Sequence, residues 1–133
     1  MFLFSKNKVE MAYHLQEIDF VGNGSFSACE PENWIIGNKK IITPHGILKV
    51  SNYKIVEQNG MVGIQFSVKG TLDFSTMCRG LVVDLSTIAF MRQPHNAWLW
   101  GYAFDKQRIP IVNFCGHDDL DGLMNFVSEI EKI

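Results

Sequence analysis

The segment Cys115-Gly116-His117 brings a cysteine and a histidine closer together than anywhere else in the chain. Thiolate and imidazole groups bind zinc, but a structural zinc site needs four ligands, usually supplied as two close pairs. The other cysteines, Cys29 and Cys78, are isolated in the sequence. The spacing therefore predicts no metal site, and it favours a strand-end thiol that packs as a small apolar group.

Two further segments contain residue types with catalytic or cofactor-binding uses. In Cys78-Arg79-Gly80 an adjacent cation would lower the pKa of the thiol, so a thiol-dependent enzyme centred on Cys78 or Cys115 is our third hypothesis. The glycine-rich stretch from Val21 to Phe26 lacks both the Gly-Lys-Ser/Thr ending of a P-loop and the third glycine of a Rossmann turn. It predicts an ordinary turn. We therefore expect no bound cofactor and no catalytic residues.

The segment Trp98-Leu99-Trp100-Gly101-Tyr102-Ala103-Phe104 alternates aromatic with smaller side chains. On a strand the four aromatic rings share one face. The first interpretation is that these rings form the core and that Gly101 and Ala103 allow another layer to approach closely. The second is that part of the row, above all Trp98 and Trp100, is an exposed platform for a partner.

Charge is distributed unevenly along the 133 residues, whose net charge is −2. Residues 116–133 contain five acidic residues and one lysine, a balance of −4, which leaves +2 for the first 115 residues. The chain has no basic stripe, so we expect no nucleic-acid binding. The acidic end instead favours a basic protein partner, and Asp118, Asp121 and Glu129 are its predicted contacts.

The elements that would position these residues are mostly strands. Period-two alternation and turn residues predict seven to nine short strands, with the clearest hairpin turning at Asn59-Gly60. A second hairpin is expected to turn at Asp84 to Thr87, and Cys29 to Asn33 is expected to be a loop around Pro31. Strand signals lie at 9–15, 34–36, 40–43, 47–50, 53–56, 61–68, 81–83, 88–91, 98–104 and 111–115, ten segments from which seven to nine strands are expected.

The period changes to that of a helix in the last segment, from about Asp118 to Lys132. Leu120, Leu123, Met124, Phe126, Val127, Ile130 and Ile133 cover roughly half of the helical wheel. We expect Asp118 and Asp121 to cap the helix and Gly122 to weaken it from within. This stripe predicts a helix that packs on the sheet.

These elements predict a single α+β domain spanning residues 1–133, β-rich over about 9–115. Its architecture is a curved antiparallel sheet or a small, partly open barrel with an amphipathic C-terminal helix at 118–132. The layout resembles that of pleckstrin-homology-like barrels, in which strands are followed by a terminal helix. An odd number of cysteines and no apolar stretch long enough to be a signal peptide or a membrane span favour a reducing cytoplasm.

The expected function is a non-enzymatic protein-binding module, monomeric or weakly dimeric, with no membrane partner. Within that class, small size and an acidic end favour a bacterial immunity or antitoxin protein that covers the active site of a toxin, for example a basic nuclease. The alternative is a pleckstrin-homology-like domain that binds a small ligand or lipid headgroup at the mouth of the barrel.

Overall fold

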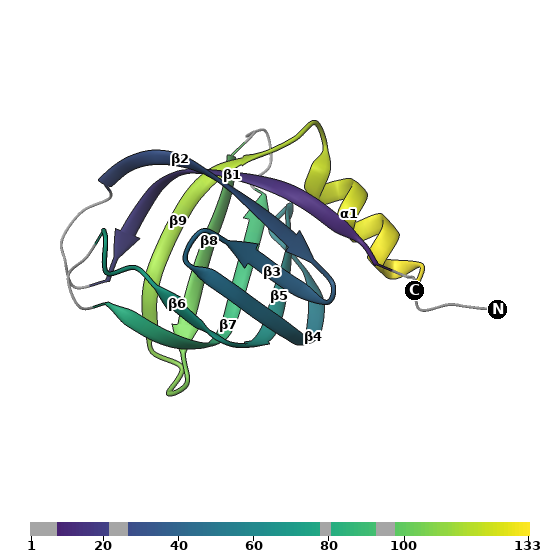
Figure 1. Cartoon of the computed structure of the whole chain (residues 1–133). Helices are drawn as coiled ribbons and strands as arrows, with labels where there is room; N and C mark the ends of the chain where they lie inside the picture. Colours follow the sequence, from purple (N-terminus) through teal and green to yellow (C-terminus); the bar gives the residue numbers. More distant parts are fainter. Residues whose placement is uncertain (1–7, 22–26, 78–80, 93–97) are drawn as a thin grey trace.

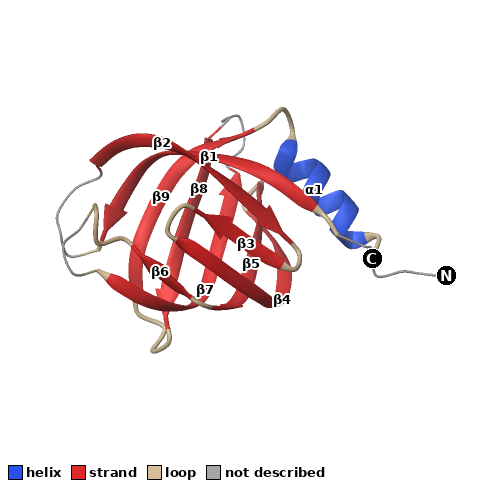
Figure 2. Cartoon of the chain, in the orientation of Figure 1, coloured by secondary structure: helices blue, strands red, loops and turns tan. Residues whose placement is uncertain are grey.

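The computed structural model describes residues 8–21, 27–77, 81–92 and 98–133, so Cys78 and the predicted turn at 22–26 lie outside the described residues. It contains nine strands and one helix, shown in Figures 1 and 2. The strands are β1 Glu10–Phe20, β2 Ser27–Gly37, β3 Lys40–Thr43, β4 Gly46–Gln58, β5 Met61–Lys69, β6 Thr71–Asp73, β7 Val82–Arg92, β8 Trp98–Asp105 and β9 Pro110–Asp118. The helix is α1 Gly122–Glu131.

Eight of the strands form a closed antiparallel barrel. The order is β5-β4-β3-β2-β1-β9-β8-β7, and β7 pairs with β5 to close the ring. The ninth strand, β6, continues from β5 and pairs with the first residues of β7. The predicted α+β architecture is therefore confirmed, and the pairing of β5 with β7 specifies a closed barrel among the arrangements that the sequence allows.

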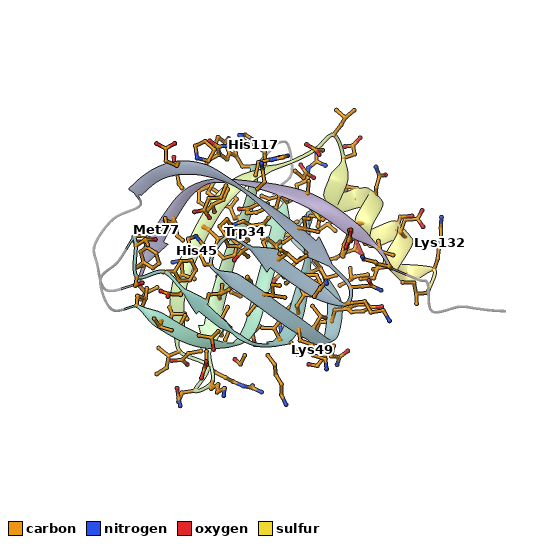
Figure 3. The ribbon with its side chains drawn as sticks, viewed as in Figure 1. Trp34, His45, Lys49, Met77, His117 and Lys132 are labelled. Atoms are coloured by element: carbon orange, nitrogen blue, oxygen red, sulfur yellow. The ribbon has the colours of Figure 1, made fainter. Side chains whose placement is uncertain are left out.

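The interior of the barrel is filled by aromatic side chains, as the dense packing around Trp34 in Figure 3 illustrates. The Tyr13 ring lies 5.7 Å from that of Trp34 and 5.2 Å from that of Phe90, between ring centroids. Phe114 lies 5.2 Å from Trp34, and Phe66 lies 6.3 Å from Phe90. An eight-stranded barrel is just wide enough for side chains to fill it, and these rings do so.

The helix α1 covers the end of the barrel at which β1 begins (Figure 1). Leu123, Phe126, Val127 and Ile130 are buried, and the Phe126 ring lies 6.2 Å from that of Phe66 inside the barrel. The predicted packing of an apolar helix face on the sheet is thus confirmed for these four residues, whereas Met124 and Ile133 of the predicted stripe are exposed. In the described part of the chain, no helix has the length and apolarity needed to cross a membrane.

Two predicted interruptions of strands are wrong. Asp84 to Thr87 is not a turn, because β7 runs through it with a register irregularity between Leu85 and Thr87, and Leu85 is buried. Cys29 to Asn33 belongs to β2. Pro31 is tolerated there because the pairing of β1 with β2 skips residues 29–31 and the pairing of β2 with β3 begins only at Ile35.

The predicted start of the helix is also wrong. Asp118 ends β9, and α1 begins at Gly122, which makes this glycine a first-turn residue and not an interior one. The N-cap residue Asp121 is left-handed, with φ 53°, and its side chain makes no capping hydrogen bond. The Leu123 N–H instead donates to Oδ2 of Asp118 at 2.8 Å. Asp118 therefore caps the helix from the end of a strand.

Candidate functional site

The aromatic row of β8 faces outward. Leu99, Gly101 and Ala103 point into the barrel and are buried, whereas the four aromatic side chains lie on the outer wall, and Trp100 is 37% exposed. The prediction that this row forms the core is wrong. A Cβ atom on Gly101 would lie 1.9 Å from Cε2 of Phe114, so the small residues of β8 give space to an interior ring.

At the helix-covered end, this row continues across β9 to β1. The Trp98 ring stacks on that of His117, with centroids 4.1 Å apart and an angle of 32° between the planes. His117 is the register partner of His14 on β1. The His14 ring in turn contacts Asp119 in the loop between β9 and α1, with 2.7 Å between Nε2 and Oδ1. Strand pairing thus joins residues from both ends of the chain.

His14 lies between two acceptors. Its Nδ1 is 2.7 Å from Oδ1 of Asn33, and its Nε2 contacts Asp119. Both contacts are satisfied at once when both ring nitrogens carry a proton. The hydrogen bond to Asn33, followed by that to Asp119, raises the pKa of His14 above its ordinary value of 6.5. The imidazole is therefore a proton-sensitive link between β1, β2 and the loop before α1.

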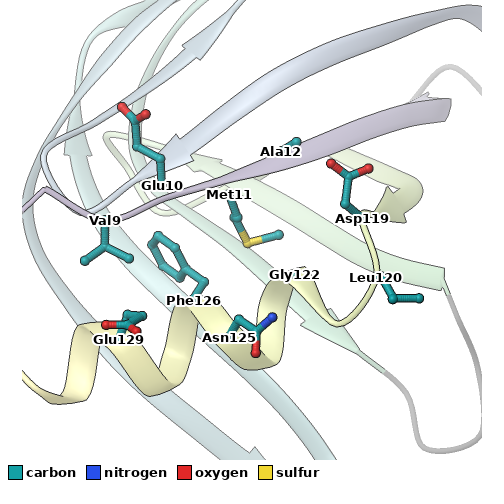
Figure 4. Close-up of a pocket in the computed structure, with 10 residues that line it drawn as sticks. All are labelled: Val9, Glu10, Met11, Ala12, Asp119, Leu120, Gly122, Asn125, Phe126 and Glu129. Carbon is teal, nitrogen blue, oxygen red and sulfur yellow. The ribbon is translucent and has the colours of Figure 1, made fainter.

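A groove of about 320 Å³ runs between β1 and α1 (Figure 4). Phe126 and Met11 point toward one another between the strand and the helix and contribute apolar lining. Three acidic residues also line the groove: Glu10, Asp119 and Glu129. The groove thus combines an apolar floor with acidic residues at its edge, of which Glu10 points away from α1 (Figure 4), and this combination suits a partner segment that carries both apolar and basic side chains.

Each of these carboxylates has a basic neighbour at the surface. Asp119 contacts His14, as described above. Oε2 of Glu10 lies 3.4 Å from Nζ of Lys8, and Oε1 of Glu129 lies 3.7 Å from Nζ of Lys132. Pairs between exposed side chains contribute only about 0–1 kcal/mol each. A desolvated basic group of a partner can therefore replace these neighbours at small cost.

The structure separates the acidic residues that the sequence grouped. Glu129 lines the groove, while Asp118 holds the first turn of the helix. Asp121 lies at the start of α1, with Oδ1 3.4 Å from Nη1 of Arg92. Of the two tryptophans predicted to contact a partner, Trp98 is the one stacked on His117, and Trp100 lies next along the outer face of β8.

The prediction that Leu120 belongs to the packed stripe of the helix is wrong. This residue precedes α1 and is 92% exposed. Its neighbours Asp119 and Asp121 make it an apolar side chain flanked by carboxylates. Helical periodicity counted Leu120 among the packed residues because nothing in the sequence shows that β9 extends to Asp118. We call Trp98, Trp100, His117, His14, Asp119 and Leu120 the aromatic–acidic face.

The environment of Cys115 does not favour nucleophilic chemistry. The side chain is on the outer wall but only 4% exposed, and it is paired in register with Trp100 on β8 and Glu17 on β1. Burial, followed by the charge of Glu17, raises the pKa of this thiol to about 11. The thiolate is the reactive form, and it is scarce near pH 7 at such a pKa. The described residues contain no cluster of three or more His, Cys, Asp or Glu able to hold a metal ion.

A second polar cluster lies toward the other end of the barrel, and sequence reasoning missed it. His45, in the turn between β3 and β4, places Nε2 2.9 Å from both carboxylate oxygens of Glu32 on β2. Nε1 of Trp34 donates to the same carboxylate at 3.1 Å, and Phe74 stacks on the imidazole at 4.7 Å. The side chains of His45 and Glu32 are only 8% and 15% exposed. The cluster therefore satisfies its own largely buried polar groups, and the groove between β1 and α1 does not border it.

No protein-family model, curated protein or solved structure matches this chain. Function must therefore be argued from the geometry of these surfaces.

Proposed function

We propose that this chain is a non-enzymatic protein-binding module of the immunity or antitoxin type. It acts in a bacterial cytoplasm by covering the active site of a basic toxin domain, such as a nuclease. The contact surface is the aromatic–acidic face together with the groove between β1 and α1. The observation that carries this proposal is Leu120, an almost fully exposed apolar side chain flanked by aspartates and adjoining the groove.

Apolar and aromatic anchors surrounded by polar residues are the usual energetic centre of a protein interface. Leu120 and Trp100 supply such anchors here, and both are exposed. The surrounding acidic residues belong to a segment with a balance of −4 in a chain of net charge −2. Acidic groups around an apolar anchor are complementary to a basic active site, and they accelerate association with it.

The test begins by capturing the partner with the full chain and identifying it. The purified partner is then assayed for toxic or nuclease activity with and without an equimolar amount of this chain. We expect a basic partner whose activity is lost at 1:1 stoichiometry, with affinity that falls as salt concentration rises. A captured partner that is acidic, or that remains fully active in the complex, would contradict the proposal.

Two variants assign the surface, each with a matched control. Leu120→Ala is expected to weaken binding at least about tenfold, as interface anchors commonly do. Its control, Ile47→Ala, removes another exposed aliphatic side chain, from β4, and should leave affinity unchanged. If both substitutions weaken binding equally, Leu120 is not the anchor.

The second variant, Asp119→Asn/Glu129→Gln, removes two charges and should reduce both the affinity and its salt dependence. Its control, Glu30→Gln/Glu57→Gln, removes two exposed carboxylates from β2 and β4. Asp118 is left intact because its carboxylate caps α1. An unchanged salt dependence in the Asp119/Glu129 variant would remove the electrostatic part of the proposal.

A further inference from the structure

A second groove, of about 290 Å³, lies on the outer wall of the barrel over β4, β5, β7 and β8. It differs in charge from the groove beside α1. Lys54 on β4 and Arg108 in the turn between β8 and β9 line it, together with Gln65, Thr87, Tyr102 and Phe104. We call it the Lys54–Arg108 groove. It contains cations, hydrogen-bonding groups and aromatic rings, and it borders none of the residues of the acidic groove.

Strand register aligns residues from four strands across this part of the wall. Lys54 pairs with Gln65, Gln65 with Ala89, and Ala89 with Tyr102, so the four residues form one row across four strands. Neighbouring strands are about 4.8 Å apart, which separates the first and last backbones of the row by roughly 14 Å. Ala89 lies between Gln65 and Tyr102 in this row but is buried and does not itself line the groove. A ligand the size of one ring with a charged substituent fits this span.

The turn between β8 and β9 fixes the backbone that carries the Arg108 side chain. Arg108 has φ 63°, in the left-handed region, and its N–H donates to the carbonyl oxygen of Asp105 at 3.0 Å. The N–H groups of Gln107 and Ile109 both donate to Oδ1 of Asp105 at 2.9 Å. The Asp105 carboxylate is thus engaged in holding the turn.

The two cations of the groove have no acidic partner among the residues that the structure describes. Neither Lys54 nor Arg108 forms a salt bridge there, whereas the adjacent Lys106 lies 3.6 Å from Asp84. A pair of uncompensated cations in a protein of net negative charge is a local feature that favours a dianion. Gln65 and Thr87 can donate further hydrogen bonds to its oxygens.

The aromatic side of the groove supplies a surface for a ring. The Tyr102 and Phe104 rings lie 5.2 Å apart, with 34° between their planes, and both face outward from β8. Planar rings stack on aromatic faces whatever their detailed chemistry. The groove therefore has cations from both of its sides, Lys54 from β4 and Arg108 from the turn after β8, and aromatic rings next to Arg108, all lining one small pocket.

We propose that the Lys54–Arg108 groove binds a small phosphate monoester carried on a planar ring. The phosphate dianion lies between Lys54 and Arg108, and the ring lies against Tyr102 and Phe104. This inference is independent of the proposed protein-binding function, because it uses a different part of the surface and an anionic ligand, whereas the proposed protein partner is basic.

The test is a titration of the ¹⁵N-labelled full chain with phenyl phosphate, followed by two-dimensional NMR. Inorganic phosphate and phenol are titrated separately, so that the charge and the ring are tested one at a time. We expect saturable shifts centred on the amides of Gln65, Thr87 and Tyr102, and binding of phenyl phosphate at least about fivefold tighter than that of either fragment. Shifts that do not saturate, or that centre elsewhere, would overturn the inference.

Variants separate the groove from general attraction of anions. Lys54→Gln and Arg108→Asn should each weaken the binding of phenyl phosphate at least about fivefold. Asparagine is chosen because it tolerates the left-handed backbone at this position, and an unchanged spectrum outside the turn verifies that the variant folds. Lys39→Gln removes an exposed cation from the turn between β2 and β3 and should have no effect. An equal loss in Lys39→Gln, or inorganic phosphate binding as tightly as phenyl phosphate, would refute the proposed site.

Discussion

Gly101→Ala tests whether the small residues of β8 make space for the aromatic interior. Considered only locally, the substitution should stabilise the protein by about 0.4–1 kcal/mol, because alanine reduces the conformational freedom of the unfolded chain. In the barrel, the added Cβ would lie 1.9 Å from Cε2 of Phe114 and 2.6 Å from two further ring atoms. The two effects have opposite signs, so the direction of the measured change decides between them.

The steric effect is expected to be the larger one. Carbon atoms in contact are about 3.5–4.0 Å apart, so the Phe114 ring would have to move by roughly 1.5 Å. The Phe114 ring is fully buried, and its centroid lies 5.2 Å from that of Trp34 and 5.4 Å from that of Phe90. Overpacking of this kind costs about 1–3 kcal/mol and occasionally more. We therefore expect a net loss of about 2 kcal/mol, equivalent to a decrease in Tm of roughly 8 °C for a chain of this length.

The assay is urea denaturation followed by tryptophan fluorescence, with an unchanged m-value as the criterion that only stability has changed. Gly122→Ala is the matched control, since the nearest atom to its new Cβ is Asp118 Cβ at 3.2 Å, and it should remain within about 0.5 kcal/mol of wild type. In a Phe114→Leu background, Gly101→Ala should cost at least about 1 kcal/mol less than it does alone. A Gly101→Ala protein as stable as wild type, or strict additivity with Phe114→Leu, would refute the reasoning.

Three further predictions concern single side chains. The raised pKa of His14 means that its contribution to stability is complete below pH 6.5, the unfolded value, and is lost as pH rises through the higher folded value. Denaturation across pH 5.5–8.5 should show this loss in wild type and not in His14→Gln. Cys115, with a pKa of about 11, should react with a disulfide reagent at pH 7.5 only in denaturant, and rapid reaction of the folded protein at this residue would contradict its burial. Asp118→Ala should destabilise the protein by about 0.5–2 kcal/mol in urea denaturation, because the Leu123 N–H loses its acceptor, whereas Asp118→Asn should retain most of the stability.

Much of the local structure follows from the sequence alone. Alternation places Ile64, Phe66 and Val68 on one face of a strand, and all three are buried in the barrel. Asn59-Gly60 specifies the hairpin between β4 and β5, and both residues have positive φ. Helical spacing likewise identifies the four residues of α1 that pack on the barrel, although the same stripe included Leu120, Met124 and Ile133, which are exposed. These features depend on neighbours within a few residues, so periodicity and turn chemistry are sufficient to find them.

The candidate sites depend on contacts that span most of the chain. His14 and His117 are adjacent only because β1 pairs with β9, and the Lys54–Arg108 groove exists only because β5 pairs with β7 to close the barrel. Closure also decides which face of β8 is outside. The alternation in β8 is the same whichever face is buried. The narrow interior already holds Tyr13, Trp34, Phe66, Phe90 and Phe114, so the four rings of β8 must lie on the outer wall.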